Sequence, residues 1–397
     1  MTAYSNDLGL VLIGGGARGA YQVGVLRALA KHHPEINIPV ITGVSAGAIN
    51  AAYLASNRMG LPDKAESLAK IWGGVTTDQV FKVDTLSLAR NVVSWAARLL
   101  TGSASLNFKA RSMVDTGPLC AMLERLLAPV NRELPGIARN IASGSLKAVA
   151  ITASSYSTGQ SVTWVQGREQ HVRERGNRKT VLCKLKLDHI LASASLPLFF
   201  PAVRIHQRWF GDGGIRMTAP LSPAIHLGAS RILAIHTRCA RSFEEPEHDQ
   251  INDYPPPAQV VGALFNAIFL DAFDNDAARL ERINHLIRGR SPEECCGMRP
   301  IQMLLIRPSR DLGELASEYE AELPRAFRFM TRGLGTQETH SNDILSLLLF
   351  GPDYLERLIQ LGYHDAEAQM DKIDTLLCDD ADIQEGRRYP PGLSNVA

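Results

Sequence analysis

The chain has 397 residues, of which 45% are hydrophobic and 21% charged, and its 42 basic and 41 acidic residues leave a net charge of +1. This is the composition of an ordinary globular protein, and the near-neutral charge gives no electrostatic footprint for nucleic acid. The six cysteines form no C-x-x-C pair. Their spacing fits neither a zinc site nor a disulfide framework and favours free thiols in a reducing cytosol.

The N-terminus lacks a basic stretch followed by a long apolar one, which predicts no secretory signal. No apolar run reaches the ~18 residues that a membrane-spanning helix requires. We therefore expect a soluble cytoplasmic protein. Peripheral contact with the inner membrane surface stays open.

Strands and helices alternate in the first 60 residues. An apolar run over 8–13 that ends in glycines predicts a buried strand, and helical spacing of apolar residues predicts a helix over 17–33. A second buried strand over 36–44 and an alanine-rich helix over 46–59 follow. This order predicts an α/β fold in which helices cover a parallel sheet.

The rest of the chain divides into an α/β part and a helical part. A polar, proline-rich surface loop is predicted over 241–257 and one long helix over 258–287. From about residue 309 the pattern is helical, so we predict an α/β domain over 1–308 and a helical C-terminal extension over 309–397. Four further strands are predicted, at 146–152, 161–165, 231–236 and 301–307.

Gly14 to Gly19 reads GGGARG between the first predicted strand and helix. Glycines there let the backbone turn sharply and present N–H groups to a ligand. The run satisfies the dinucleotide fingerprint G-x-G-x-x-G, but the acidic residue expected at the end of the second strand is absent. An oxyanion hole and a simple strand-to-helix turn are the other interpretations.

A nucleophile elbow is predicted at Gly43-x-Ser45-x-Gly47, between a predicted strand and a predicted helix. A serine at such a strained turn projects its hydroxyl above the sheet, and the flanking glycines permit close backbone passage. The helix that follows directs its N-terminal amides, including that of Ala46, at developing negative charge. Ser45 is therefore the candidate nucleophile.

Asp212 lies in a glycine turn that continues through Gly213 and Gly214. Taken alone, an Asp-Gly pair more often marks an ordinary β-turn. A serine hydroxyl, however, is a poor nucleophile until a neighbouring base takes its proton, and a carboxylate within hydrogen-bond reach can do so directly. Beside Ser45, Asp212 is therefore the candidate general base.

Together these motifs resemble those of the patatin-like phospholipase family, whose members carry G-G-G-x-R-G, G-x-S-x-G and D-G-[GA] in this order. The stretch 192–201, ASASLPLFFP, is similar to the family's A-S-x-A-x-P-x-x-F-P, with Ser195 in place of an alanine. The motif resemblance covers roughly residues 9–220. It implies a patatin-like three-layer sandwich with a mainly parallel central sheet.

The resemblance also implies a lipid acyl hydrolase of phospholipase A or lysophospholipase type, with no metal or cofactor. Asp212 would deprotonate Ser45 without a histidine, and the reaction would pass through an acyl-enzyme. The backbone amides of Gly15 and Gly16 would hold the oxyanion, and Gly14 and Arg18 would shape the loop. Arg18 has two interpretations, a structural anchor or a contact for a lipid phosphate.

Several alternatives stay open at this level. A Ser-His-Asp triad is one, since His226 and His236 follow Asp212 in the order that α/β-hydrolases use. Other functions are a carboxylesterase or thioesterase acting on soluble acyl compounds, and a regulatory or scaffold protein with a patatin fold. Ser193 and Ser195 lack an elbow context and are interpreted as loop residues.

Contact with lipid has one candidate segment, 86–100, where Leu88, Val92, Trp95 and Leu99 form one helical face. We interpret it as an amphipathic helix packed on the core, with an interfacial lid followed by Lys109 and Arg111 as the alternative. The apolar run Leu345–Phe350 is likewise expected to be buried. A phospholipid or another acyl-ester lipid is the expected partner, and a homodimer stays open.

Overall fold

The computed structural model describes residues 7–82, 114–167, 176–239, 257–269, 271–291, 293–324, 328 and 342–378. The segment 86–100, with Lys109 and Arg111, lies outside these residues, as does the predicted loop up to residue 256. Within the described part of the chain, no helix is long and apolar enough to cross a membrane.

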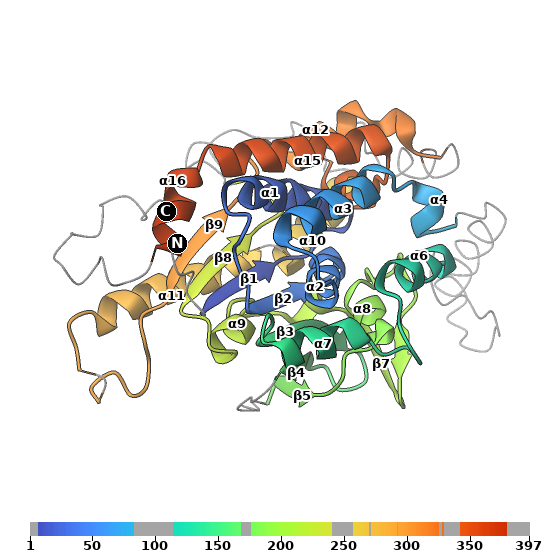
Figure 1. Cartoon of the computed structure of the whole chain (residues 1–397). Helices are drawn as coiled ribbons and strands as arrows, with labels where there is room; N and C mark the ends of the chain where they lie inside the picture. Colours follow the sequence, from blue (N-terminus) through green and yellow to red (C-terminus); the bar gives the residue numbers. More distant parts are fainter. Residues whose placement is uncertain are drawn as a thin grey trace.

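A mixed, mainly parallel sheet forms the centre of the molecule (Figure 1). Its main path runs β5-β4-β3-β2-β1-β8-β9, and the neighbours from β3 to β9 along this path are all parallel. At one end β4 is antiparallel to β3 and parallel to β5. The strands are β1 (Leu8–Leu12), β2 (Val40–Val44), β3 (Ala148–Ser155), β4 (Ser161–Gly167), β5 (Arg178–Leu182), β6 (Val203–Ile205), β7 (Arg208–Asp212), β8 (Arg231–Ile235) and β9 (Gln302–Ile306).

Helices cover both faces of this sheet, which confirms the predicted three-layer α/β fold (Figure 1). The helical elements up to the middle of the chain are η1 (Gly16–Arg18), α1 (Gly19–His32), α2 (Ala46–Ser56), α3 (Leu61–Gly73), α4 (Thr77–Val80), α6 (Gly117–Leu127), α7 (Pro135–Ser143) and α8 (Leu187–Ser193). Those that follow are η2 (Gly213–Arg216), α9 (Ser222–His226), α10 (Pro257–Phe269), α11 (Asp271–Ile287), α12 (Leu312–Glu318), η4 (Glu320–Glu322), α14 (Asp343–Leu348), α15 (Pro352–Glu367) and α16 (Met370–Leu377).

Each face of the sheet contributes side chains to its own hydrophobic core. Along β1, Leu10 and Leu12 point into the core shared with α1, α2, α3 and α15, whereas Val11 and Ile13 join the core against α9 and α11. Because successive strand residues face opposite sides, a strand covered on both faces must be apolar throughout. This explains why the sequence of β1 is a continuous apolar run rather than an alternating one.

The predicted strands all occur, although β2 begins at Val40 rather than at residue 36. Three strands were not predicted: β5, which is half-exposed, and the short pair β6 and β7. The prediction of a single helix over 258–287 was wrong, because the structure describes two helices there, α10 and α11.

The described C-terminal helices share the larger hydrophobic core with the sheet and α1. In α15, Leu355, Leu358 and Ile359 are fully buried, and the hydroxyl of Tyr21 in α1 donates to Asp365 at 3.0 Å. The run Leu345–Phe350 is buried as well, as the sequence predicted. The division into an α/β domain over 1–308 and a helical C-terminal extension over 309–397 stays a prediction.

Candidate active site

Ser45 occupies a strained turn between β2 and α2. Its backbone has φ 56° and ψ −129°, a left-handed conformation that is an outlier for a residue other than glycine. A Cβ atom on Gly43 or on Gly47 would collide with backbone, at the carbonyl of Gly47 and of Leu12 respectively. The predicted turn therefore has the geometry of a nucleophile elbow, and both flanking positions require glycine.

Strand β3 brings Asp212 next to Ser45. The end of β2 pairs with β3 in parallel, with Val44 opposite Thr152. Strand β7 then pairs with the next part of β3 in the antiparallel sense, with Asp212 opposite Ala153. Since Thr152 and Ala153 are consecutive, the residue after Val44 and the last residue of β7 meet over the same point of the sheet.

The Asp212 carboxylate is completely buried. Burial raises the pKa of Asp212 to about 7, while hydrogen bonding to the Ser45 hydroxyl and to the Gly214 backbone lowers it. Oδ1 accepts from the Gly214 amide at 2.9 Å, and Gly213 starts the short η2 helix. Oδ2 has no partner of ideal hydrogen-bond geometry among the described residues. Ser45 thus lies close to a carboxylate that retains a free lone pair for its proton.

Ser193 was wrongly interpreted as a loop residue. It is the last residue of α8 and is fully buried. Its hydroxyl accepts from the Ser45 backbone N–H at 3.0 Å and donates to the Thr152 carbonyl at 2.6 Å. One side chain therefore ties the strained elbow to β3, the strand that pairs with β7 next to Asp212. Ser195, two residues on, donates instead to the Leu191 carbonyl at 2.7 Å.

The glycine loop runs directly beside the nucleophile. A Cβ atom on Gly14 would lie 2.7 Å from the Cβ of Ser45 and 3.4 Å from its Oγ. Gly16 has φ 55°, a conformation that favours glycine, and contacts the Leu347 backbone. The buried hydroxyl of Thr237, which sequence reasoning missed, donates to the Gly14 carbonyl at 2.6 Å. Thr237 stands just past the carboxyl end of β8, where parallel-sheet proteins commonly place site residues.

Arg18 is an anchor rather than a surface cation. Its side chain is 1% exposed, and Nη2 contacts Asp343 Oδ1 at 2.6 Å. Nε donates to the Ser346 hydroxyl at 2.7 Å, and Nη1 donates to the Thr237 carbonyl at 3.3 Å. These contacts join the glycine loop to α14, and they favour the structural interpretation of Arg18 over contact with a lipid phosphate.

The two candidate histidines have different surroundings. His226 is exposed, at the end of α9. His236 is fully buried, with its ring 5.4 Å from that of Phe273. No histidine is among the described groups that shift the pKa of Asp212. Ser45 and Asp212 thus lie together over the same point of the sheet, and the Ser45 hydroxyl is one of the groups that act on the pKa of Asp212.

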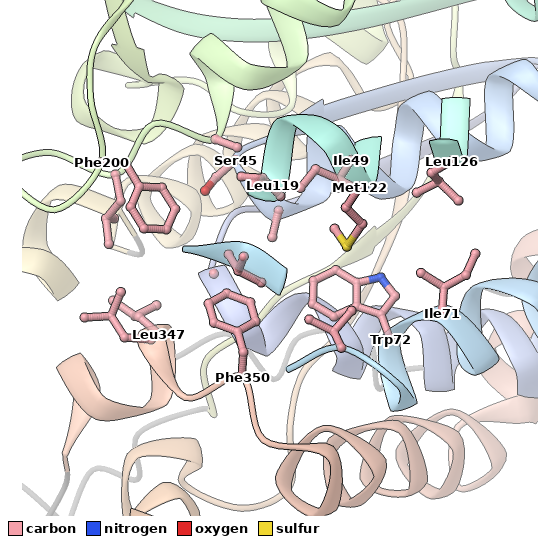
Figure 2. Close-up of a pocket in the computed structure, with 17 residues that line it drawn as sticks. Ser45, Ile49, Ile71, Trp72, Leu119, Met122, Leu126, Phe200, Leu347 and Phe350 are labelled. Atoms are coloured by element: carbon pink, nitrogen blue, oxygen red, sulfur yellow. The ribbon is translucent and has the colours of Figure 1, made fainter. Parts of the chain in front are cut away.

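An apolar pocket with a cavity volume of about 50 Å³ opens at Ser45 (Figure 2). Ser45 lies towards one end in this view, and Ile71 and Leu126 lie at the other (Figure 2). The Trp72 indole N–H is already paired with Asn50 at 2.8 Å, so the pocket presents little polar surface besides the serine hydroxyl. The walls come from α2, α3, α6, the segment after α8, and α14, with Ile49, Met122, Leu196, Phe200, Leu347 and Phe350 among them.

Over 113 residues the chain is 39% identical to patatin-like phospholipase domain-containing protein 7 of Rattus norvegicus, a match that covers 28% of this chain and 8% of that protein. The structure of VipD from Legionella pneumophila matches 94% of this chain and 68% of its own, with a TM-score of 0.42 and 13% identity. Human GIVD cytosolic phospholipase A2 matches 93% and 62%, with a TM-score of 0.44 and 11% identity. The sequence model of the family Patatin-like phospholipase matches residues 10–225, more than half of the chain. As the motifs predicted, the chain belongs to the patatin-like phospholipase family.

Proposed function

We propose that the chain is a lipid acyl hydrolase that uses Ser45 as nucleophile and Asp212 as base. The observation that carries this proposal is the strained Ser45 at the wall of an apolar pocket, beside a buried carboxylate. An ordinary turn would not retain backbone strain beside a buried carboxylate, because each costs free energy. Family membership supports the same chemistry.

The proposed reaction has two halves. The Asp212 carboxylate takes the hydroxyl proton of Ser45 while Oγ attacks the ester carbonyl carbon. The backbone amides of Gly15, Gly16 and Ala46 stabilise the resulting oxyanion. The bond to the alcohol then breaks, and the leaving oxygen takes the proton from Asp212. Water attacks the acyl-Ser45 ester with Asp212 again as base, which releases the fatty acid and returns the proton to Oγ.

The pocket supports an acyl ester as the substrate class. Its lining is apolar, so a hydrocarbon chain gains free energy by leaving water for it. No charged residue is among its described lining residues, so a lipid head group would remain outside, beyond the ester bond. We therefore propose the activity of a phospholipase A or a lysophospholipase, because the substrate of either enzyme presents one acyl chain to the nucleophile.

The test is the release of fatty acid from phosphatidylcholine vesicles and lysophosphatidylcholine micelles. We expect Ser45→Ala to lower kcat/KM by at least about a thousandfold and Asp212→Asn by at least about a hundredfold. Asp276→Asn is the matched control, because Asp276 is also a largely buried carboxylate with a raised pKa but belongs to α11. It should stay near the wild-type activity.

Two outcomes would contradict the proposal. An Asp212→Asn variant that folds and keeps most of its activity would place the base elsewhere. A wild-type protein that hydrolyses short soluble esters but neither vesicles nor micelles would be a carboxylesterase rather than a lipid hydrolase.

A further inference from the structure

Helix α10 presents an apolar face to solvent. Val260, Leu264 and Ile268 are 46%, 56% and 39% exposed, and Ala263 and Ala267 between them are exposed as well. These positions recur at helical spacing and so form one stripe. The helix, PAQVVGALFNAIF, has no charged residue. An ordinary surface helix turns its apolar stripe inward, whereas α10 is apolar both on its buried side, which carries Phe265, and on its exposed side. We call these five residues the α10 face.

The opposite side of α10 packs on the elements that build the active site. Asn266 donates to Asp343 Oδ2 in α14 at 2.5 Å. The ring of Phe265 lies 6.3 Å from that of Phe199, in the segment between α8 and β6. Both of these elements also line the acyl pocket, through Leu347 and Phe200 among others. The α10 face therefore lies on the outside of the pocket wall.

Leu198 adds a second exposed apolar side chain to this region. It is 57% exposed and has φ 68°, a left-handed conformation that is a genuine outlier for a bulky residue. Its neighbours Leu196 and Phe200 line the pocket, and Phe199 packs against α10. The strained backbone of Leu198 holds its side chain in water, where it contributes nothing to the hydrophobic core. Such strain is commonly found at functional sites.

The area of the α10 face decides whether it binds a second copy of the chain or a lipid interface. A helix of 13 residues is about 20 Å long and about 10 Å wide, so one face offers roughly 200 Å². A stable dimer interface buries about 800 Å² on each partner. The α10 face is therefore too small to hold a second copy by itself. Insertion into a lipid interface has no such threshold, because its strength scales with whatever apolar area is buried.

We propose that the α10 face and Leu198 form the surface by which this protein inserts into a lipid interface, beside the pocket that receives the acyl chain. The proposal rests on the proposed lipid hydrolase function, which requires the pocket to approach an aggregated substrate. Side chains of α10 and Leu198 enter the acyl region of the bilayer, and the neighbouring pocket then takes a lipid chain without passing it through water.

The experiment measures binding separately from catalysis. The full chain with Ser45→Ala is sedimented with sucrose-loaded phosphatidylcholine vesicles, alone and with Leu264→Asp or Leu286→Asp added. Leu286 is the matched control, because it is 60% exposed but lies near the end of α11, outside the α10 face. We expect Leu264→Asp to lower the vesicle partition coefficient by at least about tenfold and Leu286→Asp to leave it unchanged.

A second readout guards against misfolding. Leu264→Trp should show a blue-shifted emission spectrum when vesicles are added, and Leu286→Trp should not. In the chain with Ser45 intact, Leu264→Asp should keep its hydrolysis of a soluble short-chain ester. The proposal is overturned if the Ser45→Ala chain with no further substitution does not bind vesicles, or if both aspartate variants lose binding equally. It is also overturned if Leu264→Asp instead converts a dimer to a monomer. Failure of ester hydrolysis in all variants, with vesicle binding intact, would count against the hydrolase function alone.

Discussion

At the scale of single residues, the site is held together by groups that are costly to bury. Ser45 keeps a left-handed backbone, and burial raises the pKa of Asp212 to about 7. A carboxylate with this pKa is a stronger base than a solvated one, yet about half of it is ionised at neutral pH. The fold supplies compensation through the Ser193 hydroxyl and the Gly214 amide.

Ser193 is the positioning residue whose removal should separate geometry from binding. Ser193→Ala leaves the Ser45 amide without its acceptor and the Thr152 carbonyl without its donor. We expect kcat to fall by about ten- to a hundredfold, because Oγ loses its alignment, while KM for a soluble ester changes by less than about twofold. Steady-state kinetics measure both.

Ser195→Ala is the control for this substitution. Ser195 is also buried, but its hydroxyl bonds only to the Leu191 carbonyl among the described contacts, within one turn of chain. This variant should keep kcat within about twofold of the wild type. Equal losses of kcat in the two variants would mean that Ser193 supports the fold and not the elbow.

At the scale of elements, α14 connects the glycine loop to the wall of the pocket. Arg18 is buried against Asp343 and Ser346, and α14 contributes Leu347 and Leu348 to the pocket. Asp343→Asn removes the charge opposite a buried guanidinium. We therefore expect a loss of unfolding free energy of roughly 2–4 kcal/mol, since a buried cation without its partner is strongly destabilising. Urea denaturation measures this loss.

The exposed pair Arg27–Glu66 supplies the comparison. Its side chains are 35% and 50% exposed, so Glu66→Gln should change the unfolding free energy by less than about 1 kcal/mol. If the two variants lose the same stability, the contacts of Arg18 do not anchor α14.

The sequence predicts elements well where burial makes the pattern continuous. The apolar runs of β1, β3 and β8 are covered on both faces and were found. Strand β5, with the sequence RKTVL, is half-exposed at one end of the sheet, and β6 has only three residues, so neither offers a clear period. The break between α10 and α11 was missed because apolar and helix-forming residues continue across it.

The candidate site was predictable from its motifs, but its supports were not. Glycine spacing around Ser45 and Asp212 marks special backbone geometry within a few residues. Ser193 and Thr237 act through contacts with residues far away in the chain, and a lone serine or threonine has no local pattern that reveals this. The inward direction of Arg18 likewise depends on α14, more than 300 residues later.

At the scale of the whole molecule, the C-terminal helices complete the main core. Leu355, Leu358 and Ile359 of α15 are fully buried, and the Arg231 guanidinium of β8 donates to backbone carbonyls at the end of α16, including that of Cys378 at 2.6 Å. Removing these helices would expose the apolar side of α1. We therefore expect residues 1–308, expressed alone, to aggregate, and the full chain to unfold in one calorimetric transition.

Two observations would contradict the expectation that residues 1–308 depend on the C-terminal helices. A soluble fragment 1–308 with near wild-type ester hydrolysis, or two separate transitions in the full chain, would show that the C-terminal helices fold as a unit of their own.

The most direct measurement of the central claim is the rate at which a fluorophosphonate alkyl probe labels the protein, followed by mass spectrometry from about pH 5 to about pH 9. The claim is that Asp212 activates Ser45. It predicts a single adduct on Ser45, with a rate that rises as Asp212 loses its proton and levels off above pH of about 7. In Asp212→Asn the rate should be low and should not show this rise. An adduct on another residue, or an unchanged pH profile in Asp212→Asn, would contradict the account.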